Sequence, residues 1–218
     1  MNTTFKTPFP LILRTFSLFC LLTFGCCKFA TKEGIVIMLE LSKAVIELIT
    51  SFSENSDKLH QSVIKMTNAT TQAVNEKQPV KDIALFWEEN WDNIHEQFKP
   101  LEAQLKQIEV TTNQYFQKLD ENNNKISDVN LKLADKEKTL QLKARWLVEY
   151  SKASNNINDV RLMLRKGNDY IQLLRNIALR EEVEKSITDL NNISIQAENI
   201  ASSIQDFKKN TLLIFQNQ

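Results

Sequence analysis

The chain has 218 residues with 27 basic and 27 acidic side chains, but only three glycines and four prolines. β-rich and doubly wound folds need glycine and proline at their many tight turns, so this composition argues against them and predicts an all-α fold. The balanced charge, without a run of basic residues, gives no electrostatic support for binding nucleic acid.

Residues 1–27 have the composition of a secretory leader. Lys6 and Arg14 lie before or at the start of the apolar stretch 15–25, and no acidic residue precedes it. That stretch is shorter than the roughly 20 residues that span a bilayer. An anchor that began near Pro8 would place Arg14 in the membrane, at a cost of about 2.5 kcal/mol or more. We therefore expect a cleaved signal peptide, and an uncleaved signal anchor is the alternative.

All three cysteines of the chain lie within residues 20–27. A mature chain that begins after Cys27 would contain no cysteine, and so no disulfide, thiolate metal site or cysteine nucleophile. The stretch Leu22–Cys26 resembles the signal of a bacterial lipoprotein, in which a small residue precedes the modified cysteine, although Phe24 replaces a residue that is usually small. We therefore expect simple secretion with cleavage near Cys27, and Cys26 as a candidate lipid anchor is the alternative.

The segment after the leader predicts a first long helix at about 34–75. Apolar residues recur at helical spacing through it, while Glu40, Lys43 and Glu47 form a charged stripe that argues against a second membrane segment. Pro79 follows, and proline lacks the N–H group that would continue the helix. We expect the chain to turn at 76–80.

The strongest pattern in the chain is a heptad seam from Trp87 to Leu133. Steps of four and three residues connect its positions, of which only Thr112 and Asn122 are not apolar. The seam predicts a second helix at about 81–120 whose apolar side is buried against the other helices. Its phase is the same on both sides of Pro100, so we expect a kink there rather than a turn.

The polar run 120–125 contains three adjacent asparagines. Asparagines favour turns, and three of them cost about 2 kcal/mol of helix propensity relative to alanine. The run predicts a hairpin followed by a third helix at about 126–166, with Leu133, Leu140 and Leu147 in its seam. Because the heptad phase continues through the asparagines, three helices with one very long helix over 81–166 are the alternative.

Gly167 lies between a basic residue and an acidic one at 166–169. A basic last turn, a glycine after the helix and an acidic cap are the usual signals of a helix boundary, so we expect a turn here and a fourth helix at about 170–215. The four helices would then each have roughly 40 to 45 residues. Equal helices with short connections predict an elongated antiparallel four-helix bundle or coiled coil, a single domain over 34–218.

Few residues suggest catalytic or metal chemistry. His60 and His95 are the only histidines, they fall on different predicted helices, and no metal-binding motif surrounds either. The carboxylates of Glu88, Glu89 and Asp92 suit the first turns of a helix, where they complement the positive end of its dipole. The sequence has no glycine-rich phosphate loop or nucleophile motif, so we expect no enzyme activity, metal or cofactor.

The predicted topology gathers aromatic residues from three helices at the end of the bundle away from the leader. They are Trp87, Trp91, Phe98, Trp146, Tyr150 and Tyr170. Core packing is the first interpretation of this cluster. A site for a ligand or a partner is the second, because tryptophan and tyrosine combine a large apolar area with a polar group.

The same topology sets the carboxylates of the second helix near basic residues of the third, with position 88 beside position 161. Exposed ion pairs contribute only about 0 to 1 kcal/mol each, so these charges would mark a binding surface more than they stabilise the fold. The candidate partner-binding residues are therefore Trp87, Trp91, Glu88, Glu89, Asp92, Arg161 and Arg165. The end of the chain, 212–215, should lie at the opposite end, near the leader.

These patterns favour a non-enzymatic, extracytoplasmic bundle that acts as an interaction, adaptor or spacer module at a membrane surface, with a protein partner. One alternative is a ligand-sensing bundle that works through a partner. It resembles in general shape the periplasmic four-helix bundles of chemoreceptors, but it lacks their second membrane helix. Another alternative is a component of an α-helical pore-forming toxin, although charged residues interrupt every long apolar stretch after residue 34.

Overall fold

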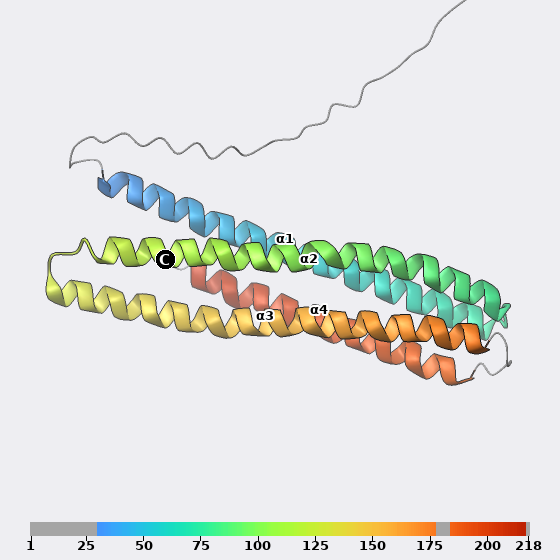
Figure 1. Ribbon diagram of the computed structural model, residues 1–218. Coiled ribbons are helices and arrows are strands. Elements are labelled where there is room, and N and C mark those ends of the chain that lie inside the picture. The colour runs from blue at the N-terminus through green and yellow to red at the C-terminus, as the bar shows by residue number, and fades with distance from the viewer. Residues whose placement is uncertain (1–29, 178–183, 217–218) are drawn as a thin grey trace, which may run out of the picture.

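The computed structural model shows four long helices, and it describes residues 30–177 and 184–216 (Figure 1). The helices are α1, Ala30–Asn75; α2, Val80–Asn123; α3, Val129–Ile177; and α4, Glu184–Gln216. Backbone contacts join α1 to α2, α2 to α3, α3 to α4, and α4 back to α1. The predicted all-α antiparallel four-helix bundle is thus confirmed. The leader, with its candidate lipid anchor Cys26, lies outside the described residues.

α2 buries the predicted seam along most of its length. Its large buried side chains recur every three or four residues and are Ile83, Trp87, Trp91, Ile94, Phe98, Leu101, Leu105, Ile108 and Tyr115. The helix continues through Pro100, as expected. The apparent continuation of the seam beyond α2 is different, because Val129 and Leu133 lie on α3 and are exposed. A continuous sequence pattern therefore spans two helices that run in opposite directions.

The turn between α1 and α2 is a Schellman motif. The backbone N–H of Lys77 donates to the carbonyl of Val74, and that of Gln78 donates to the carbonyl of Ala73, both at 3.0 Å. Lys77 has a φ of 56°, the left-handed conformation that this motif requires and that favours glycine. Pro79 then precedes α2, as predicted, at a helix end where backbone N–H groups have no intrahelical partner.

The asparagine run does form a hairpin. Oδ1 of Asp128 accepts two backbone N–H groups in the first turn of α3, each at 2.9 Å, and so caps that helix. The buried side-chain amide of Asn123 donates to the carbonyl of Lys132 at 2.9 Å and to Oδ2 of Asp135 at 3.0 Å. These bonds tie the end of α2 to the start of α3. The alternative of one long helix over 81–166 is wrong.

The turn predicted at 166–169 is also wrong, because α3 continues to Ile177. Gly167 is inside the helix, and a Cβ atom at this position would overlap the indole ring of Trp91. This glycine therefore allows a tryptophan to approach the backbone and does not end the helix. As a result the helices are unequal: α3 has 49 residues and α4 only 33. Figure 1 shows that α4 ends well before the α2–α3 turn.

Candidate interaction surfaces at the two ends

One end of the bundle holds a closed aromatic cluster, which we call the tryptophan end and define by Trp87, Trp91, Gly167 and Tyr170. The two indole rings stack with centroids 5.3 Å apart, and the ring of Tyr170 lies 4.6 Å from that of Trp87. The indole N–H of Trp87 donates to the carbonyl of Gly167, and that of Trp91 to the carbonyl of Leu164, each at 3.2 Å. The polar groups of both indoles are thus satisfied within the bundle.

The burial of these tryptophans corrects their proposed role. Trp87 and Trp91 are both 0% exposed, so their side chains pack in the core and offer no surface to a partner. Core packing, the first interpretation of the cluster, therefore describes them. A partner that binds at this end would contact the residues around the tryptophans, which include charged side chains and the exposed Leu85 and Phe86.

The other aromatic residues do not all gather at the tryptophan end. Trp146 lies in a second cluster, where its ring is 5.5 Å from Tyr150 and 6.1 Å from Phe215. Tyr115 packs edge-on against Phe215 at 5.3 Å. The hydroxyl of Ser42 donates to the carbonyl of Phe215 at 3.1 Å, which places this second cluster near the start of α1. The start of α1 and the end of α4 therefore share one end, as predicted, but Trp146 and Tyr150 are at that end too.

A row of ion pairs shows the register between α2 and α3. The pairs are Glu88–Arg175 and Glu102–Arg161, each at 2.6 Å, and Asp120–Lys143 at 2.5 Å. Between consecutive pairs the two helices advance by the same number of residues, so the antiparallel register is constant. Glu88 therefore pairs with Arg175, and its predicted neighbour Arg161 pairs with Glu102 instead. The predicted register was wrong because α2 continues to Asn123 and α3 begins at Val129, so the hairpin joins the two helices at other positions than expected.

The remaining candidate residues lie on the outside of the tryptophan end. Glu89, Asp92 and Arg165 are exposed, and within the described parts of the chain none of them takes part in an ion pair. Nearby, Nε2 of His95 lies 3.2 Å from Oδ1 of Asn168, a hydrogen bond between α2 and α3. This surface carries charges of both signs, as expected from the sequence, but without exposed tryptophans.

A groove that the sequence analysis did not predict lies between α3 and α4, next to the tryptophan end. It has a volume of about 600 Å³, and Lys166, Asp169, Tyr170, Asp189 and Gln196 are among its lining residues. Nζ of Lys166 donates to Oε1 of Gln196 at 3.0 Å across the groove. Its volume lies within the range of small-molecule pockets. The groove depends on the α3–α4 register, which was wrong in the predicted topology.

The α2–α3 turn end carries an exposed apolar line that we call the leucine stripe: Val129, Leu133, Leu140 and Leu147. These side chains are 68%, 60%, 51% and 61% exposed. The last three were expected in the buried seam of the third helix, but the inner face of α3 is formed by other residues, among them Thr139 and Trp146. The sequence periodicity correctly predicted that the leucines lie on one side of the helix. The prediction that this side is buried was wrong.

Comparison with known proteins assigns the chain to no family. No protein-family model, curated protein or solved structure matches the chain. Over residues 30–177 and 184–216, the side chains form no group of three or more metal-binding residue types that could hold an ion. No helix in the same ranges is long and apolar enough to cross a membrane.

Proposed function

We propose that the protein is a non-enzymatic interaction or spacer module that works at a membrane surface outside the cytoplasm. The observation that supports this proposal most is that α1 begins at the α2–α3 turn end of the bundle, opposite the tryptophan end (Figure 1). The segment with the features of a secretory leader precedes α1, and α1 begins at the α2–α3 turn end, where Nδ2 of Asn122 lies 3.0 Å from Sδ of Met38. An anchor in that segment would hold this end at the membrane.

The tryptophan end would then project away from the membrane. A helix of 44 residues such as α2 is about 65 Å long, so the bundle would carry this end well beyond the lipid headgroups. The exposed charges of Glu89, Asp92 and Arg165 lie there, at the place where a protein partner would meet them. Such charges set the specificity and rate of association more than its strength.

The test is to express the full chain in a bacterium that processes both secretory and lipoprotein signals. Cell fractionation and the mass of the N-terminal peptide are measured on the same sample, with Cys26→Ala as the matched variant. A lipidated Cys26, cleavage near Cys27, or an intact leader in the membrane fraction each supports an extracytoplasmic protein. An intact, unmodified N-terminus on protein found only in the cytoplasm would overturn the proposal.

A second candidate function is ligand sensing through a partner, and the groove between α3 and α4 favours it. Lys166 supplies a cation, and Asp169 and Asp189 supply anions, along a groove whose deeper wall includes the buried Tyr170. Such lining suits a small polar molecule that carries both charges. A panel of such compounds should raise the melting temperature of the native protein but not of an Asp189→Ala variant. If no compound shifts the melting temperature at millimolar concentration, the ligand-sensing function is wrong.

A further inference from the structure

We propose that the outer face of the first half of α3, the leucine stripe with its neighbouring lysines, binds the surface of an anionic lipid membrane. The inference deepens the proposed function and rests on it, because it identifies the part of the bundle that meets the membrane. Three observations carry it: the alignment of the exposed leucines, the separate inner face of the same helix, and the unpaired basic residues beside them.

The residues of the leucine stripe share one side of the helix. Leu133, Leu140 and Leu147 are seven residues apart, close to two full turns, so their side chains project in nearly the same direction. Val129 precedes them by about one turn. The line is therefore about 27 Å long. Four large apolar side chains, each more than half exposed, thus project from one side of α3, with Lys136 and Glu137 between Leu133 and Leu140.

The stripe is distinct from the packed side of α3. Trp146 is buried among the aromatic residues of the second cluster, while Leu147, the next residue, points roughly 100° away and is exposed. Thr139 is likewise buried and its neighbour Leu140 exposed. This half of α3 thus has a side that packs in the bundle and a separate side on which the stripe is exposed, while the exposed Leu131 points in a third direction.

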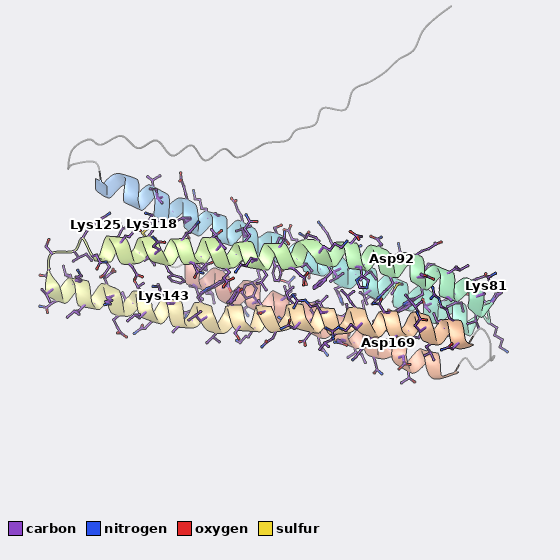
Figure 2. The ribbon with its side chains drawn as sticks, viewed as in Figure 1. Lys81, Asp92, Lys118, Lys125, Lys143 and Asp169 are labelled. Atoms are coloured by element: carbon purple, nitrogen blue, oxygen red, sulfur yellow. The ribbon has the colours of Figure 1, made fainter. Side chains whose placement is uncertain are left out.

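By helical spacing, Lys132 and Lys136 lie on one flank of the stripe, and Glu137 lies on the other. Residues 125–145 contain six basic and three acidic side chains, and Figure 2 places Lys125 and Lys143 at this end of the bundle. Among the described residues only Lys143 of this set has a carboxylate partner, Asp120. The other five form no ion pair with any described residue: Lys125, Lys132, Lys136, Lys138 and Arg145. By helical spacing, Lys138 and Arg145 point away from the stripe, which leaves Lys132 and Lys136 as its helical neighbours. Two of the three acidic residues are engaged, because Asp128 caps α3 and Asp135 accepts the amide of Asn123.

This combination fits an anionic lipid surface better than a second copy of the chain. An apolar line with Lys132 and Lys136 beside it can lie in the plane of the membrane interface, where the lysine stems extend along the apolar layer and the amines reach the phosphates. In an antiparallel pair of copies related by a two-fold axis, the flank with Lys136 would face the same flank of its partner. The like charges would then repel each other.

The experiment measures binding to vesicles by co-sedimentation, with the full chain in the processed form that cells produce. Two kinds of vesicle are compared, pure phosphatidylcholine and phosphatidylcholine with about a third phosphatidylglycerol. A lipid anchor or retained leader would act on both, so the measured quantity is the ratio of the two partition coefficients. We expect a ratio of about ten or more at low salt that decreases as salt rises.

Two double variants test the face itself. Leu133→Gln/Leu140→Gln should lower partitioning to anionic vesicles about tenfold or more, because two leucines lose their apolar contact with lipid. Lys132→Glu/Lys136→Glu should bring the ratio close to one. The matched controls are Leu162→Gln, a 47% exposed leucine elsewhere on α3, and Arg165→Glu, and both should bind as the native protein does. Circular dichroism checks that every variant keeps its helices.

Three outcomes would overturn the proposal. They are equal binding to both kinds of vesicle, an equal loss in the two controls, and a concentration-dependent dimer that the leucine variants abolish without any preference for anionic vesicles. The last outcome would assign the stripe to a second copy of the chain. Because the vesicle ratio does not depend on export, its failure is distinguishable from a cytoplasmic location, which would instead refute the proposed function.

Discussion

Trp87 and Trp91 are buried at the tryptophan end of the bundle, whereas the leucine stripe is exposed at the α2–α3 turn end. At the tryptophan end, α3 has a glycine where Trp91 approaches, and both indoles are enclosed with their N–H groups bonded to backbone carbonyls. At the α2–α3 turn end, α4 stops short and the leucine stripe stays in contact with solvent. Periodic apolar residues therefore show that a helix has an apolar side, but only its neighbours decide whether that side is buried.

The largest effect should come from filling the space at Gly167. Gly167→Ala places a Cβ atom within the ring of Trp91, so either the indole or α3 must shift, and we expect a loss of about 3 kcal/mol in the free energy of unfolding. Urea unfolding measures it. Gly34→Ala is the control, because its Cβ would meet only the side chain of Asn122 at 3.3 Å. Equal effects of the two variants would show that the tryptophan end is not closely packed.

Alkaline pH should affect the second aromatic cluster. Burial raises the pKa of Tyr115 to about 12, so its phenol stays protonated in the folded protein while the unfolded chain ionises near pH 10. The stability that this group contributes is complete below pH 10 and decreases as pH rises toward 12, by up to about 1.4 kcal/mol per pH unit. Unfolding measured from pH 9 to 12 should show this slope, and Tyr115→Phe should reduce it. An unchanged slope would mean that Tyr115 is hydrated.

The hairpin should depend on Asn123 more than on its neighbour. Asn123→Ala removes the two side-chain hydrogen bonds to Lys132 and Asp135 at a buried position, which we expect to cost about 1 to 2 kcal/mol. The exposed Asn124 is the matched control, and its replacement by alanine should change the free energy of unfolding by less than about 0.5 kcal/mol. If both substitutions have the same small effect, the α2–α3 turn end is held only by α2–α3 packing.

The smallest effect should be a gain at the α1–α2 turn. Lys77 has a positive φ, which costs a residue with a side chain about 1 kcal/mol or more. Lys77→Gly should therefore raise the free energy of unfolding by about 0.5 kcal/mol after the greater freedom of glycine in the unfolded chain is subtracted. Lys81→Gly, in the first turn of α2, should instead lower it. Thermal unfolding of the two variants compares them, and a loss at both positions would contradict the left-handed turn.

Local signals predicted those parts of the fold that local physics controls. Pro79 and the three asparagines mark real turns because proline cannot continue a helix and asparagine competes with its hydrogen bonds. The seam of α2 was correct through Tyr115 because one helix keeps one phase. Gly167 was misread because a glycine suits a helix end and a close tertiary approach equally well, and nothing near it in the sequence identifies Trp91 as its neighbour.

The candidate site was predictable only in part, for a related reason. The exposed charges Glu89, Asp92 and Arg165 follow from helix composition, and the structure leaves them on the surface. Their partners do not follow, because ion pairs such as Glu88–Arg175 depend on the α2–α3 register, which depends on where the hairpin joins the two helices. The exposure of the leucine stripe and the groove between α3 and α4 follow only from how α3 packs against its neighbours.

The placement of the three tryptophans makes the protein its own spectroscopic reporter. Trp87 and Trp91 stack at one end of the bundle, and Trp146 lies in the aromatic cluster near the other. A Trp146→Phe variant would emit only from the stacked pair, and a variant with phenylalanine at positions 87 and 91 would emit only from Trp146. Stopped-flow fluorescence of the two variants would then time the opening of each end separately, and show which end opens first.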